Sequence, residues 1–235
     1  NRFTDNGIRR SGATNGTVQG NYIGTDTAGN APSSNNRDGG FDGDGIRLSG
    51  ANGNTIGGLG AGERNVISGN DAGGDPTTHW EHGVYLWNSD NNLIQGNYIG
   101  TNFDGTVALR NFADGVAIDG NAGGGFSTGN VVRNNLLSGN KEYGVWVSYF
   151  SPNQVIQGNL IGTNFDGTLA LGNGLGAAAS PNPGAGIRLD SSGNTVGGTV
   201  LLASNVISGN NWNGVALASA HGNAVLGNYI GTDCT

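Results

Sequence analysis

GNYIGT occupies residues 20–25, 96–101 and 227–232, and the variant GNLIGT occupies residues 158–163. A second phrase alternates with it along the chain, as NVISGN at 65–70 and 205–210 and as NNLLSGN at 134–140. The two phrases form a large repeat of about 70 residues with two unequal units, and such self-similarity is the signature of a solenoid. Each unit of a solenoid buries its apolar face only by stacking on its neighbours, so we expect one continuous core.

Each unit opens with a short pattern of Gly, an apolar residue, a variable residue and usually a second apolar residue. These openings are GIRR (7–10), GIRL (45–48), GVYL (83–86), GVAI (115–118), GVWV (144–147), GIRL (186–189) and GVAL (214–217). Alternation over so short a stretch is the period of a strand with one buried face. Two shorter apolar phrases follow in each unit, for example at 92–94 and 97–99. The sequence therefore predicts an all-β solenoid of about seven coils, with three short strands in each coil.

An Asn precedes the third strand of every unit. This column comprises Asn21, Asn65, Asn97, Asn135, Asn159, Asn205 and Asn228. A second column, in register to within one position, comprises Asn15, Asn54, Asn92, Asn130, Asn153, Asn194 and Asn223. Asn tolerates left-handed backbone geometry, and identical Asn side chains stacked at strand spacing can hydrogen-bond from coil to coil. We therefore interpret both columns as structural ladders rather than as glycan or metal sites.

The repeat phrases resemble the right-handed parallel β-helix repeats of the pectin-lyase-like superfamily. GNYIGT alternating with RNVISGN is similar to repeat arrays in large secreted and cell-surface proteins of bacteria, and the resemblance covers essentially the whole chain. It implies a right-handed parallel β-helix located outside the cell or at the cell surface. That superfamily includes polysaccharide lyases, glycoside hydrolases, epimerases, tailspikes and adhesins, so the resemblance implies no single activity.

We expect residues 1–235 to form one domain. The sequence starts inside a third strand, stops just after another, and shows no amphipathic capping helix, which predicts a segment of a longer solenoid or a subunit that stacks end to end on its own copies. The net charge of −7 and the 10 basic residues argue against a nucleic-acid partner. No apolar run approaches the length needed to insert into a membrane.

Alternation on the first strand points one column of side chains outward. It comprises Arg9, Arg47, Tyr85, Ala117, Trp146, Arg188 and Ala216, and the position two residues further adds Ser49, Trp87, Asp119, Ser148 and Asp190. Aromatic rings can stack on a sugar face, and arginines can pair with a uronate carboxylate. Arg47, Tyr85, Trp87, Trp146 and Arg188 are thus candidate carbohydrate-binding residues. The competing interpretation is that Trp80, Trp87, Trp146 and Trp212 are covered by long loops or by a neighbouring subunit.

Catalysis in proteins of this kind, as the resemblance implies, uses Ca²⁺ with an Arg or Lys base in lyases, or clustered Asp acids in hydrolases. Asp119 and Asp190 are the candidate catalytic pair, although two coils should separate their backbones by roughly 10 Å, near the upper limit for an inverting glycosidase. Asp38, Asp42 and Asp44 lie in a Gly-rich loop and are candidate calcium ligands, against the alternative of an acidic solvated loop. His79 and His82 are candidate acid/base groups or surface and packing residues.

We favour a non-catalytic extracellular solenoid, acting as a stalk, a segment of an adhesive surface protein or a filament subunit, with no cofactor. The alternative is a carbohydrate-active protein that binds or cleaves an acidic polysaccharide on the first-strand face, as a polysaccharide lyase or glycoside hydrolase. The two hypotheses differ in whether the aromatic residues of that face are open to solvent.

Overall fold

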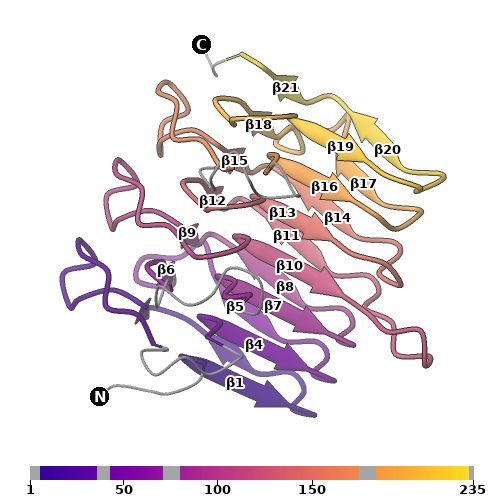
Figure 1. Cartoon of the computed structure of the whole chain (residues 1–235), viewed down its shortest axis with the longest axis horizontal. Coiled ribbons are helices and arrows are strands. Elements are labelled where there is room, and N and C mark those ends of the chain that lie inside the picture. Colours follow the sequence, from indigo (N-terminus) through magenta and orange to yellow (C-terminus); the bar gives the residue numbers. More distant parts are fainter. Residues whose placement is uncertain (1–5, 36–42, 71–79, 175–183, 233–235) are drawn as a thin grey trace.

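A computed structural model describes residues 6–35, 43–70, 80–174 and 184–232, and the secondary structure of these residues consists of short parallel strands (Figure 1). Sheet A contains β1 (Ile8–Ser11), β4 (Ile46–Ser49), β7 (Val84–Trp87), β10 (Val116–Asp119), β13 (Val145–Val147), β16 (Ile187–Leu189) and β19 (Val215–Leu217). Sheet B contains β2 (Thr17–Val18), β5 (Thr55–Gly57), β8 (Leu93–Gln95), β11 (Val131–Arg133), β14 (Val155–Gln157), β17 (Thr195–Gly197) and β20 (Ala224–Leu226). Sheet C contains β3 (Tyr22–Ile23), β6 (Val66–Ile67), β9 (Tyr98–Ile99), β12 (Leu136–Leu137), β15 (Leu160–Ile161), β18 (Val206–Ile207) and β21 (Tyr229–Ile230).

The chain visits sheets A, B and C in turn, so each coil contributes one strand to each 7-stranded sheet. Every strand pairs in parallel with the equivalent strand of the next coil, as when Ile46 pairs with Val84 and Ile56 with Ile94. This arrangement confirms the predicted right-handed parallel β-helix of seven coils with three strands per coil. The first strand of each coil begins directly after the Gly that opens the sequence pattern.

The core is a stack of apolar side chains that all three sheets point inward. Leu86, Ile94 and Ile99, one from each sheet of the same coil, are fully buried. Equivalent residues above and below are also Ile, Leu or Val, so each coil covers the apolar surface of the next. The alternation that predicted the strands is confirmed on β7, where buried Val84 and Leu86 alternate with partly exposed Tyr85 and Trp87.

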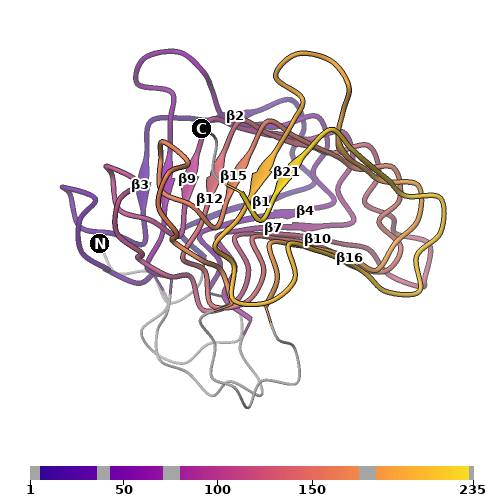
Figure 2. The same ribbon diagram turned by 90° about the horizontal axis from the view of Figure 1, so that it is seen from above.

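The corners between sheets differ in length, and the long corners give the solenoid its surface features. Residues 58–65 and 198–205 connect sheet B to sheet C as two projecting loops, visible at the upper edge of Figure 2. Hairpins closed by the bridges Thr25–Pro32, Thr101–Ala108 and Thr163–Ala170 project from the corner after sheet C. Long corners therefore project from two edges of the solenoid and leave the outer strand faces between them (Figure 2).

The first Asn column is confirmed as a ladder. The side-chain amide of Asn97 donates to the Oδ1 atom of Asn135 (3.0 Å), and Oδ1 of Asn97 accepts from the amide of Asn65 (2.9 Å). The same donor also contacts the carbonyl of Ile56, so the buried amide is fully engaged. Because the ladder lies at the corner between sheets B and C, it closes that turn in every coil.

The second column is confirmed with a shift of one position in two coils. Asn54 donates to Asn92, and Asn92 donates to Asn130. Asn194 and Asn223 continue the ladder, whereas in the two shifted coils Gly16 takes the place expected for Asn15 and Gln154 the place expected for Asn153. Asn15 and Asn153 instead adopt positive φ angles of 53° and 61°, which Asn tolerates better than most residues.

A third ladder is present that the sequence did not predict. It runs along the corner after sheet C through Asn35, Asn70, Asn111, Asn140, Asn173 and Asn210. Three of these residues are the last letter of the SGN phrase, and the other three follow the hairpins that interrupt alternate coils. The hairpin insertions hide the regular spacing of these Asn residues. The repeated SGN ending was nevertheless a signal that could have predicted the ladder.

The two ends of the described solenoid differ. Val18 and Ile23 in the first coil are 7% and 6% exposed, whereas Val225 and Ile230 in the last coil are 37% and 45% exposed. Arg10 occupies the position of sheet A that Leu48 holds in the next coil, and its side chain lies beside Gly16. Core positions are therefore uncovered in the C-terminal coil, whereas the equivalent positions in the N-terminal coil are covered.

Candidate functional site

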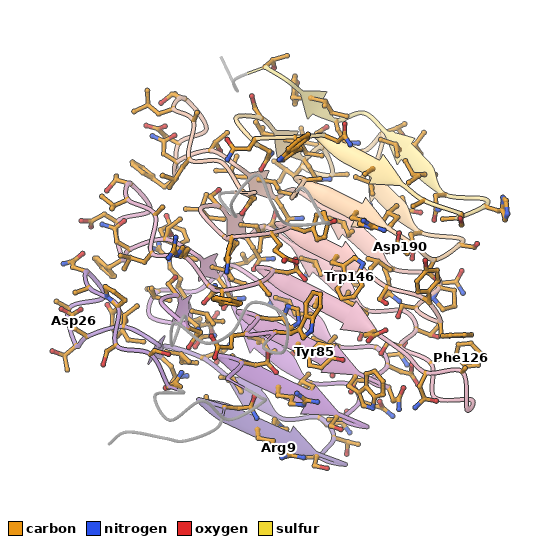
Figure 3. All side chains as sticks on the ribbon, in the orientation of Figure 1. Arg9, Asp26, Tyr85, Phe126, Trp146 and Asp190 are labelled. Atoms are coloured by element: carbon orange, nitrogen blue, oxygen red, sulfur yellow. The ribbon has the colours of Figure 1, made fainter. Side chains whose placement is uncertain are left out.

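The outer face of sheet A carries the predicted column of side chains. Strand register aligns Arg47, Tyr85, Ala117, Trp146 and Arg188 in successive coils. Figure 3 shows Tyr85, Trp146 and Asp190 on this face, together with Arg9 of the first coil. Ala117 lies between the two large rings and is fully buried, so the face divides into a half around Tyr85 and a half around Trp146.

Tyr85 lies inside an aromatic cluster. Its ring centroid is 5.1 Å from that of His82 and 6.2 Å from that of Trp87, and the guanidinium carbon of Arg47 lies 4.8 Å from the ring. The hydroxyl donates to Oδ2 of Asp119 (3.2 Å). Burial, with the nearby charge of Asp119, raises the pKa of Tyr85. Tyr85 thus packs within this cluster and holds Asp119 through its hydroxyl, and its role in carbohydrate binding stays a prediction.

Trp146 borders a hollow of about 120 Å³ that we call the tryptophan pocket. It is lined by Trp80, Glu142, Tyr143, Trp146, Tyr149, Arg188 and Asp190. Trp80 and Trp146 stack with their ring centroids 6.4 Å apart and their planes inclined by 26°. Trp80 is 44% exposed and Tyr149 is 54% exposed, so these rings present flat apolar surface to solvent. The interpretation that long loops cover the tryptophans applies to Trp146, over which Trp80 stacks. Trp80 itself remains accessible to solvent.

The polar groups of the tryptophan pocket are tightly connected. The indole N–H of Trp146 donates to Oδ2 of Asp190 (2.9 Å), and Nε of Arg188 donates to both oxygens of the same carboxylate (2.9 Å each). Nη1 of Arg188 also donates to the hydroxyl of Tyr143 (2.9 Å). These contacts fix the rotamers of Trp146 and Arg188, which gives the pocket a defined shape.

Glu142 adds a second carboxyl group to the pocket. Burial and the neighbouring charge of Asp114 raise the pKa of Glu142 to about 7. Its Oε2 atom is buried, and within the described residues it has no hydrogen-bond partner. Glu142 was not predicted as a site residue, because the corner before β13 carries no periodic pattern that could single it out.

Asp119 and Asp190 occupy the same column, as expected, but they contact different aromatic side chains. Asp119 accepts from Tyr85, and burial raises the pKa of Asp119. Asp190 accepts from Trp146 and lines the tryptophan pocket, whereas Asp119 does not line that pocket. The carboxyl group that shares a hollow with Asp190 is that of Glu142.

A column of buried polar residues lies behind the pocket, directly before the Gly that opens each coil. Oδ1 of Asp44 accepts the backbone N–H of His82 (2.9 Å), Nδ1 of neutral His82 accepts the N–H of Asp114 (3.3 Å), and Oδ1 of Asp114 accepts the N–H of Tyr143 (2.8 Å). Burial alone would lower the pKa of His82, but Asp114, Asp44 and Glu142 raise it. When His82 is protonated, Nδ1 can instead donate to Oδ2 of Asp114, 3.2 Å away. The described His82 is therefore a packing residue of the coil junction.

The calcium expectation rests on residues that the structure describes only in part. Asp38 and Asp42 lie outside the described residues, as does His79. Asp44 is buried, with Oδ1 bound to the backbone of His82 and Oδ2 3.3 Å from Nη1 of Arg47. Asp44 is thus engaged with protein groups.

Three parallel sheets and continuous polar ladders define a right-handed parallel β-helix, which carries an aromatic pocket on one outer face. The chain belongs to the family described as periplasmic copper-binding protein (NosD), which matches residues 1–233. No curated protein matches the chain. Among the described residues, none forms a helix long and apolar enough to cross a membrane.

The chain is poor in the donor groups that copper requires. Copper sites in proteins are built from thiolate, thioether and imidazole ligands. The sequence contains no Met, one Cys and three His. In the described parts of the chain, no group of three or more His, Cys, Asp or Glu side chains is placed to hold a metal ion. The described residues therefore do not fit a copper ion.

Proposed function

We propose that this chain is a non-catalytic solenoid that works outside the cytoplasm and binds an oligosaccharide in the tryptophan pocket. The observation that carries the proposal is the stacked pair Trp80 and Trp146, which borders a hollow with polar groups of fixed orientation. Sugar sites need a flat apolar surface for the pyranose face beside hydrogen-bonding groups for its hydroxyls. The family description, which names a periplasmic protein, supports the location.

The charges of the site favour a neutral sugar over an acidic one. Arg188 is paired with Asp190, and Arg47 is paired with Asp44. Each arginine is therefore already neutralised by a carboxylate, and Glu142 adds further acidic character to the pocket. A uronate would have to displace these pairs, whereas sugar hydroxyls can bond to them as they stand.

The test is binding of neutral oligosaccharides, screened on a glycan array and measured by calorimetry. Trp80→Ala and Trp146→Ala should each weaken binding by about fivefold, since loss of one stacking ring removes on the order of 1 kcal/mol. Trp212→Ala is the matched control, because Trp212 is 56% exposed and lies outside the pocket. Circular dichroism should show that all three variants remain folded. No binding to any neutral oligosaccharide, or equal binding by the wild type and both pocket variants, would contradict the proposal.

One observation favours hydrolysis as a second candidate function. Glu142 and Asp190 line the same pocket, and the raised pKa of Glu142 lets it keep a proton near neutral pH, as a general acid must. Any oligosaccharide that binds should then release new reducing ends, and Glu142→Gln should stop the release while leaving binding intact. If a sugar binds but is not cleaved, hydrolysis is excluded and only the binding function remains.

A further inference from the structure

A second hollow lies on sheet C, away from the tryptophan pocket. Its volume is about 550 Å³, and the loop 58–64 forms one of its walls. We call it the Arg64 groove. The side chains that shape it are Tyr22, Leu59, Arg64, Tyr98 and Phe103, and the remaining lining is largely glycine backbone. The glycines keep the floor low, because a Cβ atom at Gly96 would meet the carbonyl of Gly58.

Arg64 is the charged group of this groove. Its guanidinium carbon lies 4.0 Å from the ring centroid of Tyr98, a cation–π contact that holds the side chain over the groove. Within the described ranges, Arg64 makes no ion pair, in contrast to Arg47 and Arg188 on sheet A. The adjacent carboxylate of Glu63 accepts the backbone N–H of Gly60 (2.7 Å) and so turns into its own loop. The N–H groups of Arg64 are therefore available to an anionic ligand.

Aromatic surface faces the same space. Tyr22 and Phe103 are 44% and 42% exposed, and their ring centroids lie 5.9 Å apart. Phe103 is held in place by its backbone N–H, which donates to the carbonyl of Gly29 (2.8 Å). One cation beside two accessible rings suits a ligand that carries a single negative charge on a ring with an apolar face.

The chain contains its own comparison site. Residues 198–204 form the equivalent loop before β18, and they border a hollow of about 580 Å³ with Tyr229 in the place of Tyr98. Both loops project from the same edge of the solenoid in Figure 2. Ser204 stands immediately before the ladder residue Asn205, where Arg64 stands before Asn65. The two hollows thus share a loop position and a tyrosine, but the second hollow lacks both the cation and the two rings of Tyr22 and Phe103.

We propose that the Arg64 groove binds a sugar acid through its carboxylate, with Arg64 donating to the two carboxylate oxygens and Tyr22 and Phe103 contacting the ring. A guanidinium matches a carboxylate in a planar, two-bond geometry that a neutral sugar cannot reproduce. This second site does not depend on the tryptophan pocket, since the two share no residue. Charged and neutral sugars would then be held on different faces of one solenoid.

The experiment compares sugars that differ only in the charged group. Methyl β-glucuronide, its methyl ester and methyl β-glucoside are titrated into the protein and followed by saturation-transfer NMR and calorimetry, with a methyl α-sialoside as a second acid. We expect the free acid to bind at least tenfold more tightly than the ester or the glucoside, and the sialoside arm shows whether the groove accepts both kinds of sugar acid.

The variants use the internal comparison. Arg64→Ser copies the equivalent position at Ser204 and should abolish the preference for the acid, while Arg64→Lys should retain only part of it. Ser204→Arg supplies the cation without the two rings and should add a second, weaker site that still prefers the acid to the ester. Trp146→Ala should leave acid binding unchanged, and Arg64→Ser should leave neutral-oligosaccharide binding unchanged, so the two proposals fail separately. Equal binding of acid and ester, no binding of either acid, or full acid binding by Arg64→Ser would overturn the proposal.

Discussion

At the scale of single residues, the environment of Glu142 gives the tryptophan pocket a pH-dependent element. Asp114, His82, Lys141 and Arg188 all influence this carboxyl group, but burial is the largest effect and raises its pKa to about 7. Below that pH the group is neutral and can donate a hydrogen bond. Above it, the carboxylate is charged although its buried Oε2 atom has no hydrogen-bond partner among the described residues.

Glu142 should make the folded state less stable as the pH rises. The folded state holds the proton up to about pH 7, whereas the unfolded chain releases it near 4.5, so the free energy of unfolding falls across this interval. Thermal unfolding at pH 5, 6, 7 and 8 should show the wild type losing stability relative to Glu142→Gln as the pH increases. A constant difference between the two proteins across that range would show that Glu142 is ionised throughout.

The sequence predicted one part of the sheet A face and missed another, for a physical reason. Trp146 and Asp190 follow the alternation of a strand, which places them on the outer face whatever the loops do. Trp80 and Glu142 come from corners after sheet C, where no period relates sequence to direction. Their place in the pocket depends on how long corners fold over neighbouring coils, which a local pattern does not encode.

At the scale of secondary-structure elements, the Asn ladders allow coils with very short strands to stack stably. Strands of sheet C are only two residues long, as in Tyr98–Ile99. The ladder residue just before each strand adds side-chain hydrogen bonds to both neighbouring coils and binds the carbonyl of an earlier strand. The first ladder was predictable because its Asn stands at a fixed distance from the strand, while insertions obscured the third.

Asn97→Ala should be strongly destabilising. It leaves the side-chain amide and the backbone N–H of Asn65 without their shared acceptor and removes the side-chain donor to the carbonyl of Ile56, all in a buried corner. Unsatisfied buried polar groups cost roughly 1–3 kcal/mol each, so we expect a loss of about 2–4 kcal/mol in urea unfolding. Asn21→Ala, at the partly exposed end of the same ladder, is the control and should cost less than half as much. Similar losses for both would mean that the ladder contributes little beyond local turn geometry.

At the scale of the whole molecule, the described coils differ in how completely their core positions are covered. Leu217, Val225 and Ile230 hold positions whose partners in the preceding coil, Leu189, Val196 and Ile207, are fully buried. In a solenoid each coil is stabilised only by its neighbours, so the coil with one uncovered side opens most readily. The uncovered side is also where a copy of the chain would stack if the solenoid assembles end to end.

Hydrogen exchange should reveal this gradient. Amides of β19, β20 and β21 should exchange on the order of 100-fold faster than those of β10, β11 and β12, because local opening of an end coil needs less free energy than opening of the middle. Strands β1, β2 and β3 provide the comparison at the other end and should be better protected than the last coil. If copies stack end to end, protection of the last coil should rise with protein concentration. Uniform exchange along the chain would contradict the gradient.

The Asn ladders also give the solenoid an electrical direction. In each ladder one N–H of the side-chain amide donates to the Asn of the next coil and the amide oxygen accepts from the preceding coil, while the second N–H donates to a backbone carbonyl, as Asn65 and Asn97 show. The amide dipoles of a row therefore add instead of cancelling, as peptide dipoles do along an α-helix. With ladders at all three corners, the side chains form parallel rows of aligned dipoles whose positive pole is at the C-terminal coil. Small anions should accumulate at that end of the rod, and rods placed in an electric field at low ionic strength should orient along their long axis.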